Sequence, residues 1–242
     1  MVNLFNATIS TPFYNGLILL MGLFPFFDAG VIIIIFTIII KFLLLPLSIK
    51  ASKTQLQMRG TEKDLQVIKE KYKDNKSEQS IKTMEYYKEK GINPFSGFLI
   101  LLIQLPILIG LYRVFLKSGL PEINSVLLYS FVSSPPSVNM MFLNLINIAE
   151  KSLFLAIIAG ITTYFQVSLA TGTIPPSSEG STQNELARAM SMQMKYFFPI
   201  LMTFISYTIS SAIALYLITS NVFAIFQEIY IKRKYHKSVT VV

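Results

Sequence analysis

The chain has 242 residues, of which 52% are hydrophobic and only 14% are charged, a balance that excludes an ordinary soluble domain of this length. Cysteine is absent, which excludes a disulfide framework, a thiolate metal site and a thiol nucleophile. The formal net charge is +8, but in a membrane protein the positions of Lys and Arg are more informative than their sum. We therefore expect an all-α, polytopic membrane protein.

The N-terminal segment, residues 1–30, contains the apolar stretch NGLILLMGLFPFFDAG, which is interrupted by Pro25 and too short to cross a bilayer. A cleaved signal peptide is the competing interpretation. No basic residues precede the stretch, however, and no clear small-residue cleavage site follows it. We expect residues 1–30 to form an extracytoplasmic segment with an interfacial helix.

Five further stretches come near the roughly 17 to 20 apolar residues that a transmembrane helix needs. The last two lie in one run, residues 196–231, which as a single helix would be roughly 54 Å long. The run must therefore fold back, and the small polar patch SYTISS at residues 206–211 is the expected turn. The fourth span is then short and would thin the surrounding bilayer. The expected spans are residues 31–49, 93–115, 152–169, 196–210 and 211–231.

Basic residues are concentrated in three of the segments outside these spans. Residues 50–92 carry eleven of the 21 Lys and Arg, the loop 170–195 carries two, and the tail 232–242 carries four. Five spans place all three segments on one side, which the positive-inside rule makes the cytoplasm. The N-terminus and the loop 116–151 are then outside, and the C-terminus is inside.

Residues 50–92 are expected to form a cytoplasmic helical hairpin. Met58, Leu65 and Tyr72 recur every seven residues as a narrow apolar stripe, and Asn75 followed by Glu78 fits the start of a second helix. The functional interpretation is a docking arm for a cytoplasmic partner, and a solvated charged linker is the alternative. Its eleven basic and seven acidic residues argue against specific nucleic-acid binding. The candidate docking residues are Lys53, Arg59, Lys63 and Lys82.

Lys41 stands inside the first span, about eight residues or roughly 12 Å from its cytoplasmic end. A lysine stem can snorkel only part of that distance, and an ammonium at this depth costs about 2.5 to 3.5 kcal/mol or more. Thr37 and Ser48 fall on the same helix face, at spacings of four and seven. Because no Asp or Glu is expected at membrane depth, Lys41 indicates a hydrated cavity open to the cytoplasm. A snorkelling or ion-paired structural lysine is the alternative.

The other spans offer polar side chains that could share this cavity. Interhelical hydrogen bonding is the structural interpretation of any single one of them. The sequence has no paired intramembrane carboxylates and no Gly-rich phosphate loop, so we expect no enzymatic activity, no metal and no cofactor. The polar residues concerned are Gln104, Thr162, Thr163, Gln166, Tyr216, Ser220, Asn221, Gln227 and Glu228.

Several stretches resemble the YidC/Oxa1/Alb3 family of membrane protein insertases. NPFSGFLILLIQLPILIGLYRVF, residues 93–115, is similar to the family's second core span, with its NP-x-x-G start, internal Gln-x-Pro and closing LYR. KFLLLPLSIKASKTQLQM resembles the end of the first core span and the start of the hairpin. MKYFFPILMTF and LYLITSNVFAIFQE resemble the last two spans. The resemblance covers nearly the whole chain after about Tyr14.

The resemblance implies a multi-pass protein of the bacterial cytoplasmic membrane that inserts and folds membrane proteins without being an enzyme. Its partners would be nascent membrane-protein chains, ribosome–nascent chain complexes, the lipid bilayer and, as an open possibility, the Sec translocon. Substrates would enter an amphiphilic groove open to cytoplasm and lipid, in which Lys41 matches the family's basic residue. The expected groove residues are Lys41, Thr37, Ser48, Gln104, Ser220, Asn221 and Gln227.

The chain departs from the family pattern in a few places. Lysine replaces the usual groove arginine, which keeps the positive charge but loses the planar fork of the guanidinium. LYLI stands where the family often has LYW, and SSAIA where it often has PAG. About 30 residues precede the first span and about ten follow the last, so we expect no large external domain and only weak ribosome contact.

Two other function classes stay open at this point. A small ion or solute transporter could use Lys41 as its coupling site, although the internal repeats common in transporters are not found. A passive assembly scaffold would require the hairpin but not Lys41. The substrate set, Sec dependence and oligomeric state do not follow from the residues.

Overall fold

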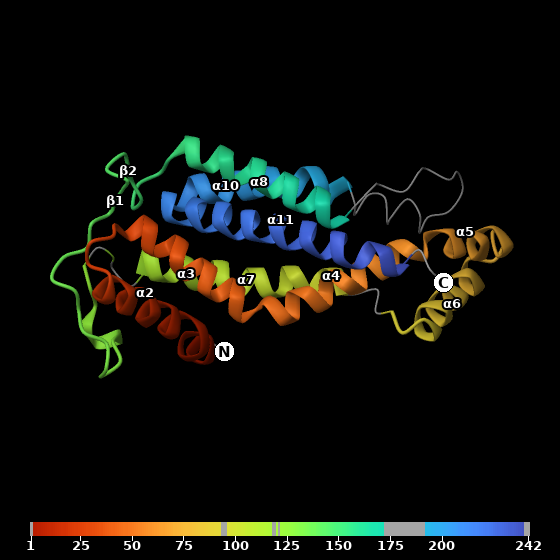
Figure 1. Ribbon diagram of the computed structural model, residues 1–242, viewed down its shortest axis with the longest axis horizontal. Coiled ribbons are helices and arrows are strands. Elements are labelled where there is room, and N and C mark those ends of the chain that lie inside the picture. The colour runs from red at the N-terminus through yellow and green to blue at the C-terminus, as the bar shows by residue number, and fades with distance from the viewer. Residues whose placement is uncertain (1, 93–95, 118–119, 121, 172–191, 240–242) are drawn as a thin grey trace.

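The computed structural model describes residues 2–92, 96–117, 120, 122–171 and 192–239, and these residues are almost entirely helical. Figure 1 shows an elongated bundle with the helical pair α5 and α6 at one end and the strands β1 and β2 at the other. We call these the hairpin end and the loop end. The helices are α1 (Val2–Phe5), η1 (Asn6–Ser10), α2 (Thr11–Leu23), α3 (Ala29–Leu43), α4 (Leu45–Gly60), α5 (Glu62–Lys71), α6 (Lys76–Glu89), α7 (Ser96–Lys117), η2 (Ser125–Leu127), α8 (Leu153–Thr171), η3 (Gln193–Phe197), α10 (Phe198–Ile209) and α11 (Ser211–Val239).

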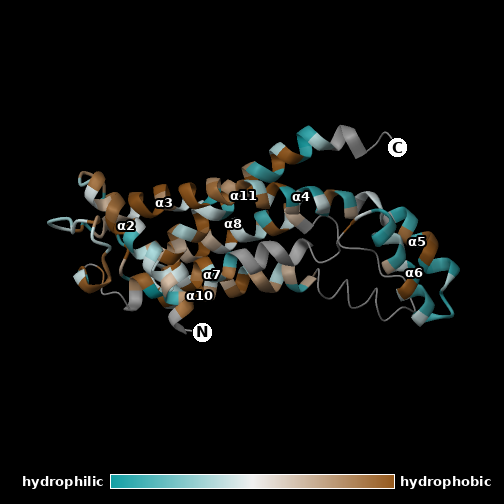
Figure 2. Cartoon of the chain, turned by 90° about the horizontal axis from the view of Figure 1, so that it is seen from below, coloured by the Kyte–Doolittle hydropathy of each residue, from teal (hydrophilic) through white to brown (hydrophobic). Residues whose placement is uncertain are grey.

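The expected all-α membrane fold agrees with this arrangement. Among the described residues, Leu153–Ala170 and Ser211–Tyr235 are each long and apolar enough to cross a membrane, and α3 with α4 makes a third crossing if the bent pair counts as one span. In Figure 2 the bundle helices are largely hydrophobic, whereas α5 and α6 are mixed. The complete five-span topology and its orientation stay a proposal.

The first expected span, 31–49, is divided in the structure. α3 ends at Leu43, and α4 begins at Leu45 with its axis turned by 64°. Pro46 explains the break, because proline has no N–H for the carbonyl four residues before it and its ring crowds that carbonyl. The straight part, α3, has 15 residues and is therefore about 22 Å long.

The last two expected spans, 196–210 and 211–231, have different boundaries in the structure. The chain breaks at Ser210, where the backbone is extended. The five residues of η3 run without a break into the 12 residues of α10, so the helix before Ser210 spans residues 193–209 and is about 25 Å long. α11 continues to Val239, through most of the tail 232–242 that was expected to follow it. The expected loop 170–195 lies for the most part outside the described residues.

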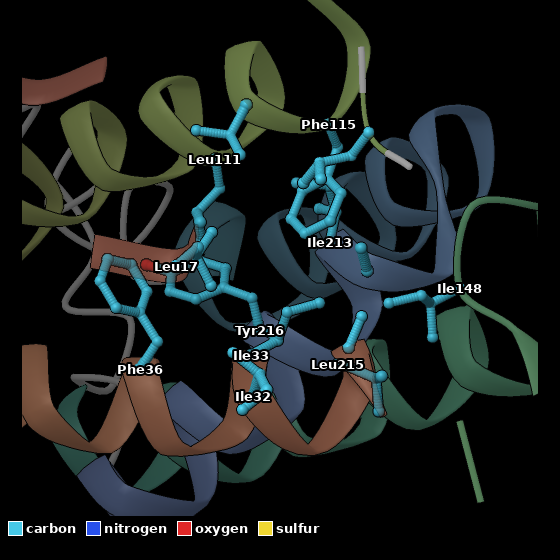
Figure 3. Close-up of a cluster of buried hydrophobic side chains, with 14 of the residues drawn as sticks. Leu17, Ile32, Ile33, Phe36, Leu111, Phe115, Ile148, Ile213, Leu215 and Tyr216 are labelled. Atoms are coloured by element: carbon cyan, nitrogen blue, oxygen red, sulfur yellow. The ribbon is translucent and has the colours of Figure 1, made fainter. Parts of the chain in front are cut away.

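The core of the bundle is an apolar cluster between α2, α3, α7 and α11. Figure 3 shows Leu17, Ile33, Leu111 and Tyr216 converging from these four helices. α8 and α10 pack closely where Gly160 faces Thr203, since a Cβ at Gly160 would collide with the Thr203 side chain. The small residue therefore sets the spacing of these two helices.

The loop end is tied together by hydrogen bonds from the N-terminal helices. The Asn15 amide donates to the Leu127 carbonyl at 2.9 Å and accepts from the Tyr129 N–H at 2.6 Å. The Asp28 carboxylate caps α3 through Val31 N–H. Tyr14 and Asn15 are buried, so α2 packs into the bundle in addition to any contact with the membrane surface. The two short strands, β1 (Met141–Phe142) and β2 (Ile146–Asn147), pair antiparallel.

The hairpin end is helical, as the apolar stripe indicates. The Asn75 side chain caps α6 by accepting from the Glu78 N–H at 3.1 Å, which confirms that predicted cap. The buried Gln79 amide donates to the Lys69 carbonyl at 2.7 Å, and the Tyr86 hydroxyl donates to the Asp64 carboxylate. These bonds join α5 to α6.

Candidate functional site

Two adjoining cavities lie between the bundle helices, with volumes of about 90 and 60 Å³. Lys41, Gln104 and Gln166 line both of them, so the two cavities adjoin along these polar side chains, while much of the remaining lining is apolar. A water needs only roughly 10 to 15 Å³ of such space together with polar partners, so the two cavities have room for several waters. We call the pair of cavities the Lys41 groove.

Lys41 enters the groove from the last turn of α3, immediately before the bend at Pro46. The two ion pairs found among the described residues, Lys82–Glu85 and Lys232–Glu228, involve other lysines. Within the same part of the chain, no hydrogen bond holds the Lys41 ammonium. A half-buried cation without a counter-ion favours water or an anionic guest beside it.

α11 forms one wall of the groove and is hydrogen-bonded to three other helices. Gln104 of α7 donates to the Tyr216 hydroxyl at 2.5 Å, and Ser220 donates to the Gln104 carbonyl at 3.5 Å. The Asn221 amide donates to the hydroxyls of Thr162 and Thr163 of α8 at 3.2 and 2.8 Å. These side chains therefore line the groove and bind helices together at the same time.

The groove continues toward the hairpin end beside α4. The Ser48 hydroxyl donates to the Gln227 carbonyl oxygen at 2.9 Å, which joins α4 to α11. Ser48, Ser52 and Gln227 line the second cavity together with the carboxylate-bearing residue Glu228. The structure thus brings Lys41, Ser48, Gln104, Ser220, Asn221 and Gln227 around one groove.

Thr37 lies outside this set. It is fully buried, and its hydroxyl donates to the Ile33 carbonyl of its own helix at 2.7 Å. It stands one helical turn from Lys41 toward the loop end, and neither of the two described cavities reaches it. Sharing a helix face with Lys41 was therefore not enough to place it in the groove.

Two polar groove residues, Ser52 and Gln55, were named neither among the expected groove residues nor among the polar side chains that could share the cavity. Ser48, Ser52 and Gln55 are spaced by four and three, which is the period of one helix face, so the pattern could have been continued past the end of the apolar run. Glu228 is buried, and its carboxylate lies 3.9 Å from the Lys232 ammonium one turn later. The negative charge of Glu228 therefore lies close to a positive charge at the hairpin end of the groove.

The outer faces of the bundle expose large apolar side chains. Phe154, Ile161 and Phe165 of α8 and Phe204 of α10 are all more than one third exposed. Such a surface would be a liability in water and is what a lipid-facing helix presents.

The four candidate docking residues occupy different settings. The Lys53 ammonium lies 4.1 Å from the centre of the Tyr235 ring, which joins α4 to α11. Lys63 is exposed on α5. Lys82 is also accessible but donates to Glu85 at 2.8 Å, and this hydrogen bond raises the pKa of Lys82. The Arg59 side chain lies outside the described part of the structure.

Comparison with known proteins matches almost the whole chain to one family. Residues 20–238 match the family model described as 60Kd inner membrane protein. The chain is 35% identical over 205 residues to a membrane protein insertase YidC of Fusobacterium nucleatum, covering 85% of this chain and 86% of that protein. It is 34% identical over 209 residues to a membrane protein insertase YidC of Clostridium tetani, covering 86% of this chain and 84% of that protein.

A more distant relative is a longer protein, of which only part is matched. The membrane protein insertase YidC of Chlorobaculum tepidum is 29% identical over 83% of this chain but only 32% of its own length. These relatives are named as insertases, a class that is not enzymatic, and they give no support to the transporter alternative. The expected resemblance is confirmed: the chain belongs to the 60Kd inner membrane protein family, the YidC/Oxa1 family of membrane protein insertases.

Proposed function

We propose that this protein inserts membrane proteins by holding a polar segment of the arriving chain in the Lys41 groove. The observation that carries the proposal is the half-buried ammonium of Lys41, which lines both cavities and has no ion-pair partner among the described residues. Family membership supports insertion as the activity. The role of the groove is our inference from its geometry.

The proposed topology has five spans, formed by α3 with the start of α4, α7, α8, α10 and α11. The hairpin end would face the cytoplasm, because α5 and α6 carry many of the basic residues, and the loop end would face outward. The groove runs from Lys41 toward Ser52 and Glu228, so it would open on the cytoplasmic side. A substrate segment could then reach Lys41 before any part of it crosses the membrane.

Electrostatics would hold an acidic segment at this point. Two opposite charges about 4 Å apart attract by about 4 kcal/mol at an effective dielectric constant near 20. Part of this attraction is offset by desolvation of the carboxylate. Amide and hydroxyl groups of Gln104, Ser220 and Gln227 can bind the polar backbone of the segment, which lowers the cost of taking it out of water.

Lateral release would follow the apolar outer surface. The substrate's apolar helix would leave the groove along α8 and α11, whose exposed faces carry Phe165 and Phe226. η3 and α10 together make a helix of about 25 Å against a hydrocarbon core of roughly 30 Å, so the bilayer beside it would be thinned. A thinner barrier lowers the free energy of moving a polar segment across.

Insertion should be tested with Lys41→Ala and Lys41→Arg in a strain depleted of its own insertase. Protease protection would report translocation of two matched substrates, one with acidic residues in the translocated segment and one with their amides. We expect Lys41→Ala to lose the acidic substrate and Lys41→Arg to retain it, at equal amounts of protein in the membrane. Equal insertion of both substrates by Lys41→Ala would remove the electrostatic step.

Ribosome–nascent chain complexes are the proposed cytoplasmic partners, and the exposed lysines Lys63 and Lys82 on the hairpin are the proposed docking residues. Contact with the Sec translocon is a further proposal. Photoreactive residues at Ser48 and Gln104, probed with a stalled ribosome–nascent chain, should crosslink to the nascent span. A folded protein without crosslinks at either position would contradict the groove as the substrate path.

A further inference from the structure

The loop end carries a set of large apolar side chains that the rest of the described chain leaves uncovered. Phe26 follows α2, and Phe131 lies in the loop between α7 and β1. Their side chains are 73% and 71% exposed. Val126, Leu143 and Leu145 are 89%, 58% and 79% exposed. We call these five residues the loop-end rim.

Backbone geometry presents part of the rim. Leu143 and Asn144 form the turn between β1 and β2 with φ angles of 51° and 58°, in the left-handed region. Asn tolerates this conformation, but leucine adopts it only with backbone strain. The Leu143 N–H donates to the Asp28 carboxylate at 3.0 Å, which holds the turn in place. The fold thus keeps a strained leucine whose side chain gains little packing within the protein.

The lengths of the helices indicate what covers the rim. α3 is about 22 Å long and the helix formed by η3 and α10 is about 25 Å long, both shorter than a hydrocarbon core of roughly 30 Å. Phe26 lies directly before the start of α3, so it extends the apolar surface of this helix outward. Leu23 at the end of α2 and Leu153 at the start of α8 are also exposed, which makes the rim continuous with the outer faces of the bundle.

Two further features fit a membrane interface. Phe26 lies 4.5 Å from Phe27 between ring centres, and Tyr129 lies 5.5 Å from Phe131, so aromatic rings are paired at this end. Tyrosine favours the boundary between acyl chains and headgroups, which fits Tyr129, and the phenylalanine rings beside it are apolar enough to contact acyl chains. Polar backbone near the rim is also satisfied from within, for example the Tyr129 N–H by Asn15. Figure 2 shows hydrophobic segments among the loops at this end.

We infer that the loop-end rim is immersed in the outer leaflet of the membrane, where lipid headgroups and upper acyl chains cover it. The rim then supplies apolar contact that the short α3 lacks, and it fixes the depth and tilt of the bundle. The inference rests on the span arrangement of the proposed function but not on the charge of Lys41. A docking surface for a second copy of this chain is the competing occupant.

The absence of cysteine from the sequence allows a clean test, because each engineered cysteine carries the only label. We would prepare Phe131→Cys and Leu145→Cys, label them with an environment-sensitive fluorophore and reconstitute the full chain in phosphatidylcholine nanodiscs. Spin-labelled phosphatidylcholine, with the spin at the headgroup or high on the acyl chain, is the quencher. Phe204→Cys on the outer face of α10 serves as the lipid control, and Lys63→Cys on the hairpin as the water control.

Quenching of both rim positions to about the extent of Phe204, and several-fold above Lys63, is the result expected. Quenching no stronger than at Lys63, with Phe204 quenched, would overturn the inference. Fluorescence at the rim that differs between discs reconstituted with one copy and discs reconstituted with two copies would show a second copy and overturn it as well. Loss of quenching at Phe204 would overturn the span arrangement and the rim together, whereas a failed Lys41 insertion assay leaves the rim result standing.

Discussion

Gln104→Glu would place a carboxylate in the groove beside Lys41 without changing the size of the side chain. Gln104 lines both cavities with Lys41 and contacts the hydroxyls of Tyr216 and Ser220. Both hydroxyls can donate to a carboxylate, so the new charge would be hydrogen-bonded where it stands. Lys41 would then have a counter-ion inside the protein.

The size of the effect follows from the competition between this internal carboxylate and the substrate's own. Opposite charges about 4 to 6 Å apart attract by about 3 to 4 kcal/mol at an effective dielectric constant near 20, and we take this as the attraction between Lys41 and the new carboxylate. If desolvation offsets about half of that, about 1 to 2 kcal/mol remains. An arriving acidic segment would have to displace this interaction, which corresponds to roughly a 5- to 30-fold loss.

The assay is the initial rate of insertion into proteoliposomes for the acidic substrate and its amide-substituted match. We expect Gln104→Glu to slow only the acidic substrate. The same substitution in a Lys41→Ala background should add little, because the double-mutant cycle isolates the interaction between positions 41 and 104. An equal loss for both substrates, or an undiminished loss in the Lys41→Ala background, would refute the electrostatic account.

Two further predictions concern stability. Gly160→Leu should destabilise the packing of α8 on α10 by about 1 to 3 kcal/mol, because the new side chain collides with Thr203; a thermal unfolding midpoint in detergent equal to that of the parent would contradict this. Burial, and then the hydrogen bond to Asp64, raises the pKa of Tyr86 to about 12. The unfolded tyrosine ionises near pH 10, so the contribution of Tyr86 is complete below that pH and is lost as the pH rises toward about 12. The protection factors of the α6 amides, which correct for the intrinsic base-catalysed exchange rate, should fall more across this range in the parent than in Tyr86→Phe, and identical profiles would remove the role assigned to this bond.

The helical fold could be predicted because apolar runs of span length, basic loops and the cap at Asn75 each depend on residues close together in sequence. The direction of the chain after Leu43 could not be predicted from the sequence. Pro46 lacks a backbone N–H and therefore predicts a break in the helix. The angle of 64° between α3 and α4, however, depends on what each helix packs against. Ser52 and Gln55 continue the helix face of Ser48, but the contact of this face with the groove depends on the bend and was not predicted.

Thr37 and Lys41 show that a helix face can be predicted correctly while the extent of the cavity along that face is not. A shared helix face was read correctly from their spacing, but the groove occupies only part of that face. The hydroxyl of Thr37 is satisfied by its own helix and can be buried in apolar surroundings, whereas an ammonium has no such local acceptor. Periodicity places a residue around a helix axis; the depth at which a cavity begins depends on the side chains of the neighbouring helices.

The hydrogen bonds of the groove join helices and, in the described part of the chain, do not involve Lys41. Gln104 and Gln227 each accept from a serine hydroxyl, that of Ser220 and that of Ser48, in bonds that join α7 and α4 to α11. Each amide oxygen has a second lone pair, so these bonds hold the helices together without excluding the ammonium. Among the described residues, neither of the two ion pairs involves Lys41. An acidic substrate segment can pair with Lys41 without first displacing a contact that the fold depends on.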